Sequence, residues 1–88
     1  HEIERPDFGF DGAWMRIGDA GELHLLGFPP PEPVGQHFAI HVDDLDEALA
    51  TLAADGIVPD RTGEIDGICL QAFLSDPSGN LVELNQPL

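Results

Sequence analysis

Three side chains of this 88-residue sequence have the chemistry to bind a divalent metal ion: His24, His37 and Glu83. Neutral imidazole and carboxylate groups bind ions such as iron, manganese, nickel and zinc, and two histidines with one carboxylate leave coordination positions open for a substrate. The three residues are far apart along the chain, so spacing alone does not predict a site. The elements that carry them must bring them together.

Each candidate also has a simpler interpretation. A single histidine in a strand is commonly a half-buried group satisfied by hydrogen bonds. Glu83 lies between Val82 and Leu84, which is the alternation of a strand with one solvent-facing side. Glu22 lies two residues before His24 on the same strand face, so either of these two residues could point inward.

The strand predicted for residues 36–42 positions His37, because apolar and polar residues alternate along it. A helix follows, with Asp44 as its N-cap, Glu47 three residues later as in a capping box, and Gly56 to end it in a left-handed conformation. Its apolar stripe has the spacing of one helix face. The residues of this stripe are Leu45, Ala48, Leu49, Leu52 and Ala53.

Three more strands are predicted after the helix. Residues 57–58, just before Pro59, indicate a short edge strand, residues 68–74 a longer strand, and residues 81–85 the last one. The last two are joined by residues 76–79, Asp-Pro-Ser-Gly, which fit a type I turn position by position. The second part of the chain is therefore predicted to have the order β-α-β-β-β.

The sheet built from these strands has two unlike faces. The apolar face can pack on the helix stripe and consists of Phe38, Ile40, Val42, Leu70, Ala72, Leu74, Val82 and Leu84. The opposite face is polar and consists of His37, His41, Gln71, Glu83 and Asn85. Since His37 and Glu83 share this polar face, the topology favours a site there even though their spacing does not.

The first part of the chain predicts a hairpin. Residues 13–17 and 22–26 indicate two strands around a Gly-rich turn, and residues 1–8 an extended segment before them. A proline-rich stretch follows that can be neither helix nor central strand. We expect residues 1–28 to form a first module of strands, residues 29–35 a linker, and residues 36–88 a second module.

Composition limits the classes of partner. Seventeen acidic residues against three arginines, with no lysine, give a net charge of −14. A surface this negative repels phosphate backbones and anionic headgroups, so we expect neither nucleic acid nor membrane as partner. The sequence has no bilayer-length apolar run and does not start like a signal peptide, which predicts a cytoplasmic protein. Cys69 predicts a buried thiol, and the thin core of so short a chain predicts a homodimer.

Two segments resemble the signatures of one superfamily. Residues 36–48 resemble its opening, a histidine and an apolar strand followed by Val-Asp-Asp-Leu at the start of a helix. Residues 73–84 resemble its closing hairpin, Phe-x-x-Asp-Pro-x-Gly-Asn-x-x-Glu-Leu. Together they are similar to the vicinal oxygen chelate superfamily, which includes glyoxalases, extradiol dioxygenases and bleomycin-resistance proteins. Residues 10–28 resemble part of the first module of that superfamily.

The resemblance implies an α+β fold whose curved mixed sheet forms a cup from βαβββ modules. It places His37 and Glu83 at two metal-binding positions of the second module. A further ligand position of the first module falls on residues 20–25, where we favour His24, with Glu22 as the alternative. The first module of the family also begins with its own strand and helix, and we expect this chain to lack both.

The implied function is that of a glyoxalase-like metalloenzyme, of lyase, isomerase or dioxygenase type, in which a divalent metal chelates two oxygens of a small-molecule substrate. Glu83 would then combine a metal-binding with a catalytic role. Trp14, Gln71 and Phe73 are candidates for the substrate pocket. The alternative is a metal-free, bleomycin-resistance-like protein that binds a cationic aromatic molecule through Trp14, Phe73 and an acidic surface.

Overall fold

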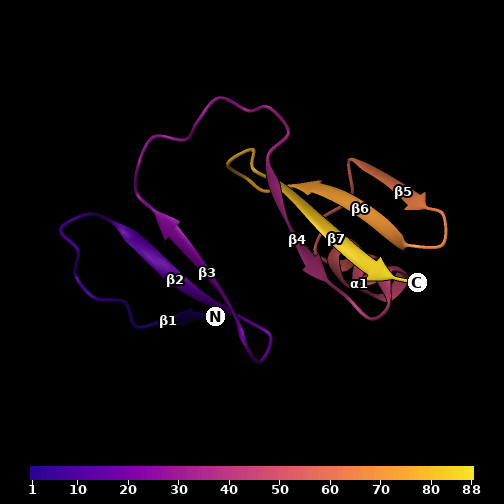
Figure 1. Cartoon of the computed structure of the whole chain (residues 1–88), viewed down its shortest axis with the longest axis horizontal. Coiled ribbons are helices and arrows are strands. Elements are labelled where there is room, and N and C mark those ends of the chain that lie inside the picture. The colour runs from indigo at the N-terminus through magenta and orange to yellow at the C-terminus, as the bar shows by residue number, and fades with distance from the viewer. The chain divides into compact units, whose positions relative to one another are not determined.

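The computed structural model describes all 88 residues, and the chain divides into two units, His1–Glu32 and Pro33–Leu88. Figure 1 labels the strands β1 to β3 of the first unit, and the strands β4 to β7 and the helix α1 of the second. The helix α1 is neither long nor apolar enough to cross a membrane.

The first unit is a three-stranded antiparallel sheet in the order β1-β2-β3. Its strands are β1 (Glu2–Ile3), β2 (Gly12–Ile17) and β3 (Gly21–Leu26). The β2–β3 hairpin confirms the two strands predicted from alternation. Its turn contains Gly18 with a φ of 61°, a conformation that glycine adopts without steric cost.

The second unit is a four-stranded mixed sheet with one helix. Its elements are β4 (His37–His41), α1 (Leu45–Ala54), β5 (Arg61–Ile65), β6 (Cys69–Ser75) and β7 (Leu81–Pro87). The strand order is β4-β7-β6-β5, with β4 parallel to β7 and the other pairs antiparallel. The predicted α+β class and β-α-β-β-β order are confirmed. The last strand of the chain, β7, therefore lies inside the sheet, next to the first strand of the unit.

The edge strand predicted at residues 57–58 is wrong, because the edge strand is β5, Arg61–Ile65. The reason is the end of α1. Gly56, with a φ of 78°, donates its N–H to Ala53, and Ile57 donates its N–H to the carbonyl of Leu52. This pair of bonds is a Schellman motif, so the backbone of Ile57 completes the helix end and cannot enter a ladder.

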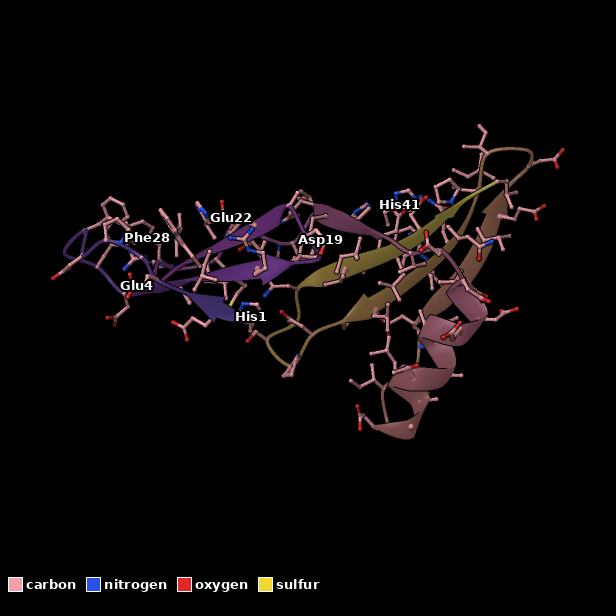
Figure 2. The ribbon with its side chains drawn as sticks, turned by 90° about the horizontal axis from the view of Figure 1, so that it is seen from below. His1, Glu4, Asp19, Glu22, Phe28 and His41 are labelled. Carbon is pink, nitrogen blue, oxygen red and sulfur yellow. The ribbon has the colours of Figure 1, made fainter.

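The helix packs on one face of the sheet and forms the core there (Figure 2). The centre of this core is buried and consists of Leu45, Ala72, Leu74 and Leu84, surrounded by Ile40, Val42, Ala48, Leu49, Leu52 and Leu70. Three residues expected at this interface are outside the core cluster, since Phe38 and Ala53 are exposed and Val82 is half-buried without joining it. On the opposite face Cys69 is a buried free thiol, as predicted.

Candidate functional site

The structure brings His37 and Glu83 together. His37 is the first residue of β4, and Glu83 lies in the middle of β7, opposite Ala39 in the parallel ladder. His37 is two positions before Ala39, so its side chain lies on the same face of the sheet as that of Glu83. The Nε2 atom of His37 is 3.0 Å from Oε1 of Glu83.

The ring of His37 is oriented by a second contact. Its Nδ1 atom lies 2.8 Å from the carbonyl oxygen of Gly35, and since a carbonyl only accepts, Nδ1 must carry the proton and donate it. Gly35 has a φ of 89°, a conformation that favours glycine, and it turns the chain immediately before β4. In the neutral imidazole, Nε2 then presents its lone pair toward Glu83, which is the tautomer that a metal-binding histidine needs.

The carboxylate of Glu83 is held by two amides. Gln71 of β6 donates to Oε2 over 3.1 Å, and Asn85 of β7 donates to the same oxygen over 2.8 Å. Glu83 is only 6% exposed, which is unusual for a glutamate. Because both amides bind Oε2, Oε1 is the carboxylate oxygen that remains directed at His37.

The pKa values of the two groups shift in opposite directions. The Gly35 carbonyl, and after it the Glu83 carboxylate, raise the pKa of His37 above its usual value, although the charge of Arg61 opposes them. The amide of Asn85 lowers the pKa of Glu83 most, with help from Gln71 and His37 and against the effect of burial. Both shifts favour the charged form of the group, the imidazolium for His37 and the carboxylate for Glu83.

Phe73 and Arg61 extend this site along the same face. Phe73 lies directly opposite Glu83 in the β6–β7 ladder, and its ring meets that of His37 edge to face at 5.4 Å. The guanidinium carbon of Arg61 lies 4.2 Å from the centroid of the same Phe73 ring. Arg61 was not among the predicted site residues, because placing the edge strand at residues 57–58 leaves it in a loop. The helix end at Gly56 was predicted, but the bond from the N–H of Ile57 to the carbonyl of Leu52, which keeps Ile57 out of the sheet, was not.

The remaining sequence candidates belong to the first unit. His24 lies opposite Trp14 in the β2–β3 ladder, and their rings stack at 4.1 Å with an angle of 5° between their planes. Glu22, labelled in Figure 2, lies opposite Arg16 and is exposed. The roles of His24, Glu22 and Trp14 stay predictions.

His37 and Glu83 fit two ligand positions of one metal ion. Two ligand atoms that are each about 2.1 Å from an ion, at right angles, are about 3.0 Å apart, which is the separation found here. Each ligand atom also has an orienting partner behind it, Gly35 for the imidazole and the amides for the carboxylate. The structure contains no group of three or more His, Cys, Asp or Glu side chains placed to hold one ion.

Known proteins share this sequence pattern and fold. The family model of the Glyoxalase/Bleomycin resistance protein/Dioxygenase superfamily matches residues 5–84. The structure is similar to that of a glyoxalase family protein from Bacillus anthracis, with a TM-score of 0.81 and 26% identity, covering 99% of this chain and 72% of the other. A glyoxalase family protein from Enterococcus faecalis matches with a TM-score of 0.68 and 29% identity, covering 97% of this chain and 74% of the other. Among curated proteins, none matches the sequence.

Proposed function

The chain belongs to the Glyoxalase/Bleomycin resistance protein/Dioxygenase superfamily, and from this premise we propose that His37 and Glu83 bind a divalent metal ion in a small-molecule enzyme. The contact between Nε2 of His37 and Oε1 of Glu83 carries this proposal. It is supported by the buried carboxylate and by the orienting bond to Gly35. Imidazole nitrogen with carboxylate oxygen favours iron, manganese, nickel or zinc as the ion.

A bound ion would supply Lewis-acid chemistry, polarising two substrate oxygens that it chelates. The protein residues keep the ligands ready for this. Gly35 holds the imidazole in one orientation, so little rotational freedom is lost when it binds. Gln71 and Asn85 keep Glu83 ionised and fix its plane. Oε1 of Glu83, which has no amide partner, is the candidate atom for accepting a proton from the substrate.

Other parts of the proposal extend the sequence predictions. His24, with Glu22 as alternative, would add a ligand from the first unit, and Trp14, Gln71 and Phe73 would line the substrate pocket. Residues 1–28 and 36–88 would be the two modules, joined by the linker 29–35. We further propose that the protein acts as a cytoplasmic homodimer, with a lyase, isomerase or dioxygenase reaction on a small molecule.

The second candidate function is metal-free binding of a cationic aromatic molecule, and one observation favours it. The first unit carries aromatic rings in mutual contact, with Phe8 6.2 Å from Trp14 and Phe10 4.7 Å from Phe28. Phe8 and Phe28 are more than half exposed. Exposed aromatic side chains in an acidic protein attract cations, and the guanidinium of Arg5 already lies over the rings of Phe8 and Phe10.

Metal analysis separates the two candidates. The purified protein is loaded with iron, manganese, nickel or zinc in turn, passed through a desalting column, and its metal content measured by mass spectrometry. We expect the wild type to retain one of these ions, and His37→Ala and Glu83→Ala to lose it. His41→Ala is the matched control, because His41 lies on the same face of β4 and forms no hydrogen bond with Glu83. Unchanged metal content in both site variants, or no retention by the wild type, would refute the metalloenzyme.

A further inference from the structure

The second unit contains one basic residue besides its histidines, Arg61, among many aspartates and glutamates. Arg61 is the first residue of β5, and in the ladder it lies opposite Phe73, which in turn lies opposite Glu83. Residues opposite one another in a sheet project from the same face. Arg61, Phe73 and Glu83 therefore form one row across three strands, on the face that carries His37.

The guanidinium is held beside the proposed metal ligands. It stacks over the Phe73 ring, and the His37 ring contacts the same Phe73. Phe73 is 9% exposed, since it is covered from these two sides. The acid nearest to it on this face, Glu83, is paired with His37 and not with Arg61. A fixed cation thus lies next to the site without an acidic partner.

The orientation of Arg61 leaves its hydrogen-bond donors available. Stacking on an aromatic ring uses the flat face of the guanidinium, whereas its five N–H groups point outward in its plane. That fork matches a carboxylate or a phosphate, which it can bind through two parallel hydrogen bonds. The net charge of −14 repels anions from the rest of the surface. Apart from the proposed metal ligand His37, Arg61 is the residue on this face that attracts anions.

We propose that Arg61, stacked on Phe73, binds an anionic group of the substrate, a carboxylate or a phosphate, while the ion on His37 and Glu83 chelates two other substrate oxygens. This assignment rests on the proposed metal site and adds a substrate class to it. The substrate is an acid that bears its negative group a few bonds from the chelating oxygens. Arg61 is a specificity-determining residue in this arrangement.

Two pairs of acids, all with the same chelating end, test the proposal. 2-Oxoglutarate and 2-oxopentanoate differ in the distal carboxylate, as do 2-oxoadipate and 2-oxohexanoate one methylene longer. Affinities are measured by calorimetry on metal-loaded protein. We expect the wild type to bind the diacid of one pair about tenfold more tightly than its monoacid, as for hydrogen bonds to a charged group. In Arg61→Gln the difference should vanish while the monoacid binds as before, and Arg16→Gln, which removes an arginine from the first unit, should behave like the wild type.

The outcomes separate failure of this inference from failure of the metal site. Equal binding of diacid and monoacid by the wild type, or a preference that survives in Arg61→Gln, overturns the role of Arg61 and leaves the metal site standing. Arg61 would then serve as a charged residue that protects the edge strand β5 from pairing with other chains. If the protein retains no metal, a thermal-shift titration with inorganic phosphate replaces calorimetry. A shift that Arg61→Gln abolishes supports the anion site, and one that it leaves unchanged overturns it.

Discussion

Nε2 of His37 lies 3.0 Å from Oε1 of Glu83, across 46 residues of sequence, because β4 and β7 are neighbouring parallel strands. The same two atoms are the ones that would coordinate a metal ion. Without a metal, the shifted pKa values of the two groups favour an ion pair there, and metal and proton compete for the imidazole. The pH dependence of stability and that of metal affinity can both be measured.

The ion pair predicts how the stability of the metal-free protein depends on pH. The pKa of His37 is raised from 6.5, so its contribution is complete below pH 6.5 and is lost as pH rises through the raised value. The pKa of Glu83 is lowered from 4.5, so its contribution is present above pH 4.5 and is lost as pH falls through the lowered value. Urea unfolding in the presence of a chelator should therefore show wild type and His37→Gln differing most between pH 4.5 and 6.5. A difference that persists undiminished at pH 9 would contradict this.

Metal affinity should depend on pH in the opposite direction. An imidazolium cannot coordinate, and the raised pKa of His37 keeps the ring protonated above pH 6.5. We expect metal affinity to rise with pH through that region and to level off once the ring is neutral. Competition with a chelator of known pH dependence, followed by fluorescence, measures it. Affinity that is constant from pH 6 to 9 would exclude His37 as a ligand.

The amides that hold Glu83 should matter for the metal although neither contacts it. Removing the hydrogen bond from Asn85 or Gln71 leaves the carboxylate less well oriented. Removing a hydrogen-bond partner of a metal ligand typically weakens metal affinity by about 10- to 100-fold. We expect Asn85→Ala and Gln71→Ala each to weaken binding by about tenfold while still retaining an ion. His41→Ala is again the control, and site variants indistinguishable from it would show that the amides have no such role.

The sequence predicted most of the second unit because each local signal agreed with the fold. Alternation put His37 and Glu83 on one face, and Asp44, Glu47 and Gly56 marked the ends of the helix as observed. Alternation does not say which strands are neighbours. The structure shows that β4 lies beside β7, whereas the expectation that His37 and Glu83 share one metal ion came from the resemblance of the two motifs to a known family.

The errors arose where one backbone group could serve two purposes. Ile57 and Val58 have strand-forming side chains, but the N–H of Ile57 is already used to close the helix. The edge strand is in fact Arg61–Ile65, which places Arg61 over Phe73. Because the strand was predicted elsewhere, Arg61 was not recognised as a candidate for binding an anion.

The apolar character of Phe38 predicted burial, whereas its side chain is 37% exposed. Phe38 is exposed because β4 is an edge strand and has a neighbouring strand on only one side.

The core beneath the site should tolerate neither loss nor gain of volume. Leu84 lies beside Glu83 on β7 and is 7% exposed, and Ala72, opposite it on β6, has no exposed surface. Leu84→Ala should lower the free energy of unfolding by about 2–5 kcal/mol. Ala72→Leu should lower it by about 1–3 kcal/mol, because no space exists for the added atoms. Chemical denaturation measures both, with Val58→Ala, at an exposed position, as the control. A stable Ala72→Leu protein would show that the helix can move away from the sheet.

The start of α1 depends on two separate hydrogen bonds, one of which comes from the strand that carries Glu83. Asp44 accepts from the N–H of Glu47 over 3.0 Å, and Oε1 of Gln86 in β7 accepts from the N–H of Leu45 over 2.7 Å. Asp44→Ala should cost about 1 kcal/mol of stability, and Gln86→Leu a similar amount, since it leaves a helix N–H without a partner.

The two bonds satisfy different N–H groups, so their losses should add in the double variant. Gln86→Glu is the matched control, because it keeps the acceptor oxygen and places a negative charge where the helix dipole favours one. Urea unfolding of the four proteins with the wild type measures the set. If the double variant is no less stable than Asp44→Ala alone, Gln86 does not hold the helix to β7. The helix would then be attached to the sheet by its apolar stripe and its connecting chain alone.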